Sequence, residues 1–306
     1  MKKDILSLAD LEVSDFKWLF DRAAELKARH KKGIQDRTLT GKSLGLIFDK
    51  PSTRTRISFE AAAIHLGATP IFIHSGDTQM ARNEPIEDTA RVLSRYLDGV
   101  AFRTFSQELI EQFAAAADIP VINALTDKFH PCQVLSDLLT VIEHKGALEG
   151  LTISWIGDGN NMAHSWINAA AALGFALNLA CPKAYYPDKG VMSRARKKNK
   201  RIFLTTSPID AAQGADVINT DVWASMGQEH EQKERQAVFK PYQVNSLLLE
   251  VAAKDAIVMH CLPAHRGEEI TGEVLDGPQA VVWDQAENKL HMHKAILDIL
   301  MTSSGR

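Results

Sequence analysis

Short apolar runs alternate with amphipathic segments along most of the chain. The apolar runs, each bounded by turn-forming residues, predict buried strands, and apolar residues recurring every three or four positions predict helices. The predicted strands span residues 44–48, 70–73, 99–102, 120–123, 151–156, 176–180, 201–205, 217–220, 256–260 and 280–283. The predicted helices span residues 10–30, 53–66, 85–97, 107–117, 133–144, 162–173 and 294–301.

This alternation is typical of α/β proteins, in which parallel sheets are covered by helices on both faces. A chain of 306 residues has the length of two such domains. The pattern breaks after Lys145-Gly146, so we place a boundary near residue 148. We expect a first domain over 1–148, joined by a C-terminal helix over 290–306, and a second domain over 149–289. Each is predicted to be a doubly wound parallel sheet flanked by helices.

Composition narrows the classes of function. The formal net charge of −3 gives no electrostatic reason to expect nucleic acid or an anionic membrane as a partner. No stretch approaches the roughly 18 apolar residues that a membrane span needs. The three cysteines do not form a CxxC pair, and no signal peptide is visible. The sequence therefore predicts a cytoplasmic protein.

Ser52-Thr53-Arg54-Thr55-Arg56 stands where a predicted buried strand gives way to a helix. A helix start offers backbone N–H groups and the positive end of the helix dipole, and arginine can grip a phosphate with two hydrogen bonds. The segment is therefore predicted to bind an anion without a glycine-rich loop. The alternative is a helix capped by Ser52 with arginines on the surface.

Arg103 follows the predicted strand 99–102, and His130-Pro131-Cys132-Gln133 begins a long helix. Ligands of open α/β sheets bind beyond the carboxyl ends of the strands, where Arg103 and Arg54 are both expected. His130 and Gln133 could then both face a carbonyl or amide group. Taken singly, Arg103 could be an ordinary surface residue and His130 part of a structural turn.

Three segments of the second half also follow predicted strands. Gly157-Asp158-Gly159-Asn160-Asn161 resembles a dinucleotide-binding turn, but Met162 stands where a third glycine belongs. Asp221 and Ser225 precede Gly227, an arrangement that could hold the ammonium and carboxylate of an amino acid. Cys261, in His260-Cys261-Leu262-Pro263, is placed for contact with a substrate. A zinc site of His260, Cys261 and His265 is the alternative, although a second well-spaced pair is missing.

Taken together and in this order, these motifs resemble the transcarbamylase family. Residues 52–56, Arg103 and residues 130–133 are similar to the family's carbamoyl phosphate site, and residues 157–161, 221–227 and 260–263 to its ornithine-using branch. The resemblance implies a doubly wound two-domain transcarbamylase fold that needs no cofactor and no metal. For carbamoyl phosphate it implies the ligands Ser52, Thr53, Arg54, Thr55, Gln79, Arg103, His130, Gln133, Cys261, Leu262 and Lys289. For ornithine it implies Asn161, Asp221, Ser225 and Met226, and for catalysis Arg54, Arg103, His130, Cys261 and Asp221.

The resemblance further implies a homotrimer with its active sites between the domains, Gln79 reaching a neighbouring subunit's site, and a cis bond before Pro263. Two positions depart from the family. Lys289 stands where an arginine is usual, and Met80-Ala81-Arg82-Asn83 replaces a glycine-rich stretch after Gln79. Lysine is a point charge that cannot make a forked contact with phosphate.

The expected reaction is attack of the neutral δ-amine of ornithine on carbamoyl phosphate through a tetrahedral intermediate, in arginine biosynthesis. An amine with a pKa near ~10.4 must first lose its proton. Arginine-rich surroundings and desolvation would make that easier. Three other classes stay open at this point: a transcarbamylase for aspartate, putrescine or an acylated ornithine, a binding protein that has lost activity through Lys289, and a nucleotide-dependent oxidoreductase.

Overall fold

The computed structural model describes residues 3–74, 76, 78–79, 83–224 and 231–303. The chain divides into two compact units. Unit 1 comprises residues 1–136 and 289–306, and unit 2 comprises residues 137–288. Residue 148, the predicted boundary, lies in the turn after helix α5 (Pro131–Lys145).

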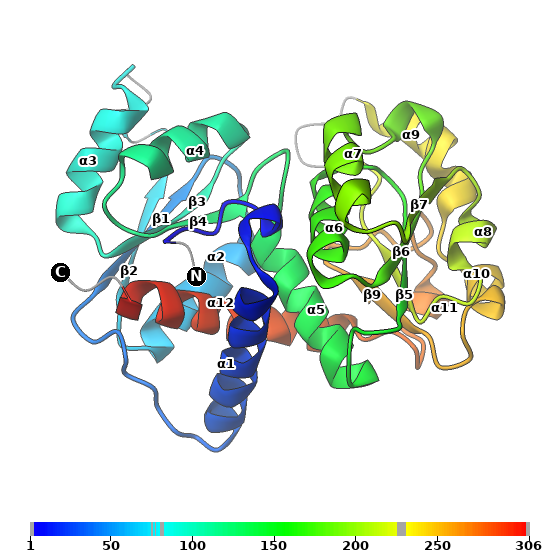
Figure 1. The fold of residues 1–306 in the computed structure, drawn as a ribbon, viewed down its shortest axis with the longest axis horizontal. Coiled ribbons are helices and arrows are strands. Elements are labelled where there is room, and N and C mark those ends of the chain that lie inside the picture. The colour runs from blue at the N-terminus through cyan, green and yellow to red at the C-terminus, as the bar shows by residue number, and fades with distance from the viewer. Residues whose placement is uncertain (1–2, 75, 77, 80–82, 225–230, 304–306) are drawn as a thin grey trace. The chain divides into compact units, whose positions relative to one another are not determined.

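Unit 1 is built on a four-stranded parallel sheet with the order β2-β1-β3-β4. Figure 1 shows α3 and α4 on one face of this sheet and α1, α2 and α12 on the other. Its strands are β1 (Ser43–Phe48), β2 (Thr69–His74), β3 (Gly99–Arg103) and β4 (Val121–Leu125). Its helices are η1 (Leu8–Asp10), α1 (Val13–Lys31), α2 (Thr53–His65), α3 (Ile86–Tyr96), α4 (Gln107–Ala116), the start of α5 and the end of α12 (Val282–Ser303).

Unit 2 is built on a five-stranded parallel sheet with the order β7-β6-β5-β8-β9. Helices α6 and α7 cover one face, and α8 and α10 lie on the other (Figure 1). Its strands are β5 (Thr152–Ile156), β6 (Ala176–Ala180), β7 (Ile202–Thr205), β8 (Val217–Thr220) and β9 (Ile257–His260). Its helices are α6 (Asn161–Leu173), η4 (Lys183–Tyr185), α7 (Lys189–Lys198), α8 (Pro208–Ala212), α9 (Gln232–Phe239), η6 (Lys240–Tyr242), α10 (Ser246–Val251) and α11 (Gly272–Leu275). The predicted fold class, two parallel sheets flanked by helices, is confirmed.

The predicted strand 280–283 and the predicted start of the last helix are wrong. Ala280 forms only an isolated bridge with Val258, and α12 already begins at Val282, well before residue 294. The helical period was hidden because polar side chains occupy buried positions at helical spacing. Gln285, Asn288 and Lys289 are each at most 5% exposed, so the buried face of α12 does not read as apolar.

Each unit has its own apolar core. In unit 1 the interior includes Ile47, Val100, Phe102 and Phe113 between the sheet and α3–α4. In unit 2 it is formed by side chains of β5, β8 and β9 with those of α8–α11. Within the part of the chain that the structure describes, no helix combines the length and apolar character that a membrane crossing requires.

Candidate functional site

In unit 1, the neighbouring strands β1 and β3 bring two predicted segments to one edge of the sheet. Phe48 is paired with Arg103 at the ends of these strands, and Asp49 N donates to Arg103 O at 2.9 Å. The chain turns toward β2 after β1 and toward β4 after β3. This is a topological switch point, where open α/β sheets leave room for a ligand. Arg103 and the start of α2 therefore flank the position at which the fold itself favours binding.

Helix α2 presents its first turn without help from Ser52. Ser52 occupies the N-cap position, as predicted, but its side chain accepts no hydrogen bond from the described residues of the first turn. Thr53 and Arg54 are exposed, whereas Thr55 is buried. Because a side-chain cap would compete with a bound anion for these amides, its absence suits an anion site.

The opposite side of α2 is fixed by α12. Ser58 Oγ lies 2.9 Å from His293 Nδ1, and the rings of Phe59 and His293 stack with centroids 3.7 Å apart. Burial, with the charge of Lys289 adding to it, holds the pKa of His293 well below its ordinary value. This support could not be predicted from the sequence, because His293 is separated from α2 by most of the chain.

Lys50 is a further residue that sequence reasoning missed. It is 8% exposed, its ammonium contacts the Asp127 carboxylate, and it lies 4.0 Å from the centroid of the Phe105 ring. These contacts tie the turn after β1 to the segments after β3 and β4. Lys50 directly precedes Pro51-Ser52, and this position next to the predicted anion site could have indicated its role.

His130, Gln133 and Lys289 form a buried polar group beside Arg103. Lys289 Nζ donates to Gln133 Oε1 at 2.8 Å, and all three side chains are at most 5% exposed. Burial, then the charges of Lys289 and Arg103, hold the pKa of His130 well below its ordinary value. His130 is therefore neutral at pH 7, and a neutral imidazole can donate one hydrogen bond to a carbonyl oxygen.

Gln79 is an exposed residue whose carbonyl accepts from Glu84 N at 3.1 Å. Residues 80–82 of the unusual stretch after it lie outside the described residues, whereas Asn83 is described with a φ of 66°.

In unit 2, Asp221 and Cys261 meet beyond the ends of β8 and β9. Cys261 Sγ donates to Asp221 Oδ1 at 3.2 Å, and Val222 N donates to the same oxygen at 2.8 Å. Among the described residues, Asp221 Oδ2 has one long contact, in which Asn160 Nδ2 donates to it at 3.5 Å. Burial raises the pKa of Asp221, and the hydrogen bonds from Cys261 and Val222 oppose that effect. Oδ2 is thus the carboxylate oxygen best placed to accept from an ammonium or amine.

Asn160, which precedes the predicted ligand Asn161, is the residue of this pair that contacts Asp221. Asn160 is the N-cap of α6, because its Oδ1 accepts from Met162 N and Ala163 N, and it is also the residue that reaches Asp221. Asn161 is the first residue of α6 and is partly exposed. Both follow β5, which lies next to β8 at the switch point of this sheet. The predicted ligands Ser225 and Met226 lie outside the described residues.

A buried network holds the segment from Cys261 to Pro263. Leu262 N donates to His260 Nδ1 at 2.9 Å, and His260 Nε2 lies 3.0 Å from Glu269 Oε1. Since Nδ1 accepts, the proton of a neutral His260 belongs on Nε2, where it meets the carboxylate. Leu262 has a φ of 59°, and the implied cis bond before Pro263 is confirmed. Glu269, fully buried, was missed because nothing nearby in the sequence marks it as polar core.

The zinc alternative is weakened by the same network. Ligand atoms of Asp221, His260 and Cys261 do lie within 4.8 Å of one another. However, both ring nitrogens of His260 already form hydrogen bonds, to Leu262 N and to Glu269. A metal would have to displace one of them. His265 is half exposed, and its backbone N–H donates to Glu269.

In the glycine-rich turn after β5, the space beside Gly159 is filled by the backbone of residues 185–187. A Cβ on Gly159 would lie 2.3 Å from Pro187 N and 2.6 Å from Tyr185 O. Asp158 beside it forms a buried ion pair, with Arg235 Nη1 2.8 Å from its Oδ2. Burial raises the pKa of Asp158 to about 6 although Arg235 opposes this. The interpretation of this turn as a nucleotide loop therefore loses its main support.

Known proteins resemble the chain over nearly its whole length. Residues 3–143 match the carbamoyl-P binding domain of aspartate/ornithine carbamoyltransferase, and residues 149–300 match its Asp/Orn binding domain. An ornithine carbamoyltransferase of Syntrophus aciditrophicus strain SB is 59% identical over 98% of this chain and 100% of its own length.

Two solved structures extend the comparison. An ornithine carbamoyltransferase from Pyrococcus furiosus has a TM-score of 0.93 and 47% identity, covering 96% of this chain and 95% of that one. An anabolic ornithine carbamoyltransferase from Campylobacter jejuni has a TM-score of 0.90 and 38% identity, covering 98% and 99%. With both sequence domains and the complete fold matched, the chain belongs to the aspartate/ornithine carbamoyltransferase family of transferases.

Proposed function

We propose that this protein is an ornithine carbamoyltransferase, which converts carbamoyl phosphate and L-ornithine to L-citrulline and phosphate. The observation that carries the choice of ornithine is the carboxylate of Asp221 held by Cys261, with Oδ2 oriented for a cationic or amine group. The Syntrophus and Pyrococcus relatives bear this name, which supports the assignment. Arg103, His130 and Lys289 provide the cationic and donor groups that a phosphorylated carbamate needs.

For carbamoyl phosphate, the phosphate is assigned to the start of α2, with Ser52, Thr53, Arg54 and Thr55, and to Arg103. Backbone amides at a helix start and forked guanidinium groups are strong ligands for a dianion. The carbamoyl group is assigned to His130, Gln133, Lys289 and the main-chain carbonyls of Cys261 and Leu262.

Neutral His130 donates to the carbonyl oxygen and so stabilises the charge that develops there in the tetrahedral intermediate. Lys289 takes the place of the usual arginine. Its ammonium is held at Gln133, so it supplies charge at a fixed point even though it cannot fork.

For ornithine, Asn161, Asp221, Ser225 and Met226 are assigned to the α-amino and carboxylate groups, and Cys261 with Asp221 to the δ-amine. The amine attacks the carbamoyl carbon in its neutral form. The C–N bond forms, the intermediate collapses with cleavage of the C–O bond to phosphate, and the departing phosphate takes the proton from nitrogen. Most of the rate enhancement then comes from positioning and electrostatics.

We assign the biosynthetic direction, in the cytoplasm, and a homotrimeric assembly. The Campylobacter relative is described as anabolic, which supports the direction. For the assembly, Ile57 and Ile64 are two turns apart on α2 and are 55% and 61% exposed, and Ile71 on the edge strand β2 is 42% exposed. Contact with another copy would cover such side chains. Gln79 is assigned to the neighbouring subunit's phosphate.

A citrulline assay with carbamoyl phosphate and each of four acceptors tests the function. L-Ornithine should give citrulline, while aspartate, putrescine and N-acetylornithine should give no carbamoylated product at equal concentration. Preferred use of one of the other three would replace the substrate assignment, and no product from any acceptor would refute the activity. Mass measurement by light scattering tests the trimer.

A further inference from the structure

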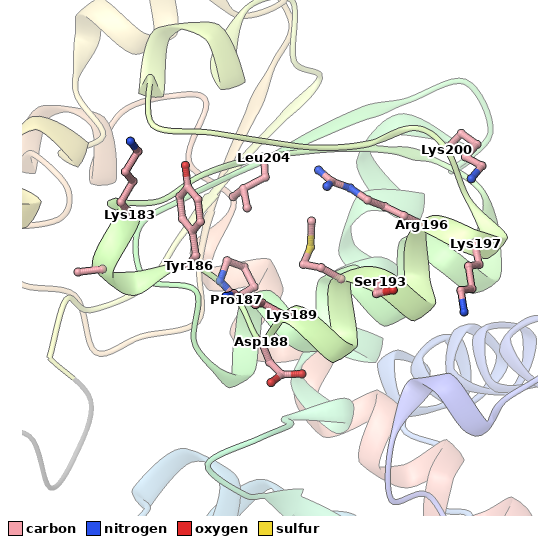
Figure 2. A pocket seen from close by; sticks show the side chains of 12 residues that line it. Lys183, Tyr186, Pro187, Asp188, Lys189, Ser193, Arg196, Lys197, Lys200 and Leu204 are labelled. Carbon is pink, nitrogen blue, oxygen red and sulfur yellow. The ribbon is translucent and has the colours of Figure 1, made fainter.

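Unit 2 carries an open pocket with a volume of about 760 Å³ that none of the assigned substrate ligands line. It lies along η4, α7 and the edge strand β7 (Figure 2). Five of the side chains that line it are cations and only one is a carboxylate: Lys183, Lys189, Arg196, Lys197 and Lys200, with Asp188. Arg196, Lys197 and Lys200 belong to the basic run of the sequence over residues 194–201, and the structure places them around this hollow.

The positive charge of this pocket is not neutralised by ion pairs with other described residues. None of the five cations forms an ion pair with another described residue, although the protein as a whole has a net charge of −3. The carboxylate of Asp188 is engaged as the N-cap of α7, accepting from Val191 N at 2.8 Å. In Figure 2 this carboxylate points away from Tyr186 and Leu204.

The helix dipole of α7 accounts for the positions of only some of these cations. Arg196 and Lys197 lie in the last turn of α7, where the dipole favours cations. Lys189 is the first residue of the same helix, where the dipole opposes a cation, and Lys183 and Lys200 lie outside the helix. All five side chains are exposed, so solvent screens their mutual repulsion, and their shared charge favours an anion in the hollow.

The pocket also has an apolar and aromatic lining. Met192 is buried, Leu204 is partly buried, and the ring of Tyr186 is 39% exposed. Arg196 Nε donates to Ile202 O at 3.0 Å, so this guanidinium is held against the edge strand. Figure 2 shows its side chain extending from α7 toward Leu204 and Tyr186. A flat ring and a polyphosphate chain could thus be bound side by side.

We propose that this pocket binds a nucleoside triphosphate. The triphosphate meets the lysines and Arg196, and the base stacks on Tyr186. The volume is within the range of roughly 300–1,000 Å³ that small-molecule sites have. A base on an aromatic ring is a sequence-tolerant contact, so the pocket accepts more than one base.

The test is calorimetric titration of the whole protein with ATP at low ionic strength, compared with inorganic tripolyphosphate. ATP binds more tightly than tripolyphosphate, and Tyr186→Ala removes the difference. Lys183→Ala/Lys200→Ala weakens ATP by at least tenfold and leaves citrulline formation unchanged. The matched control, Lys233→Ala/Lys254→Ala, removes two exposed lysines of unit 2 that do not line the pocket and leaves ATP affinity unchanged.

Arg54→Ala separates this pocket from the proposed carbamoyl phosphate site, and it should retain ATP binding. The proposal is overturned if ATP does not bind, if the pocket variant binds as the wild type does, or if the control lysines matter equally. Loss of ATP binding in Arg54→Ala would also overturn it, since ATP would then occupy unit 1.

Discussion

Asp221→Asn tests the ornithine assignment most directly. The substitution keeps Oδ1, which accepts from Cys261 and Val222, because an amide oxygen can take its place. It replaces Oδ2 with an NH₂ group that cannot accept from the substrate nitrogen. A hydrogen bond to a charged partner contributes about 1.5–3 kcal/mol. At about 1.4 kcal/mol per factor of ten, ornithine should bind roughly 10- to 150-fold more weakly.

The assay is citrulline formation with ornithine varied at saturating carbamoyl phosphate, and then the reverse. The KM for ornithine should rise while the KM for carbamoyl phosphate stays unchanged. Burial raises the pKa of Asp221, so the wild type loses this negative charge as pH falls toward that raised value. Ornithine affinity of the wild type should therefore decline on acidification more steeply than that of the Asn variant.

Asp210→Asn is the matched control, because it removes the same charge from an exposed position of unit 2. Both variants should keep the circular dichroism spectrum of the wild type. An ornithine KM within threefold of the wild type, or equal losses for the two substrates, would show that Asp221 does not contact ornithine.

Arg54→Ala should abolish turnover without lowering the melting temperature, since Arg54 is exposed, and a near-normal kcat would contradict its role. Lys289→Met should raise the KM for carbamoyl phosphate by roughly tenfold or more, whereas Lys289→Arg should leave it unchanged or lower it; a clear loss with arginine would show that the ammonium is specifically fitted. A thiol reagent at pH 8 should label Cys261, which is partly exposed, and spare Cys132, because burial raises the Cys132 pKa to about 12; peptide mapping checks this. Between pH 3.8 and about 6, folded Asp158 binds a proton that the unfolded chain has lost, so this group makes the free energy of unfolding fall as pH rises. Urea titrations of Asp158→Asn should lack that slope.

Much of the fold could be predicted because its signals are local. The strands from β1 to β9 were visible as short apolar runs, and the segments that follow them marked both switch points. Helix α12 was mispredicted at its start because Gln285, Asn288 and Lys289 are buried polar residues. Apolar periodicity cannot detect a helix face whose burial depends on hydrogen bonds rather than on the hydrophobic effect.

The candidate site was predicted unevenly for a related reason. Residues within motifs, such as Arg103, His130 and Cys261, could be proposed from position alone. Their supports, among them Lys50 and Glu269, act across turns or long stretches of sequence, and pairing over such distances leaves no local pattern. Asn160 was missed because its role depends on the capping geometry of α6, which the sequence alone does not show.

The close packing at Gly159 limits how unit 2 could evolve to bind a dinucleotide. In a dinucleotide-binding turn, the corresponding glycine leaves space for a cofactor's pyrophosphate. Here the space in front of Gly159 is filled by the backbone around Pro187, which is continuous with the start of α7. A mutation that introduced any side chain at 159 would have to push that segment aside. Recruiting this turn for a redox cofactor would thus require rebuilding the chain from residue 185 onward, and not merely adding a third glycine.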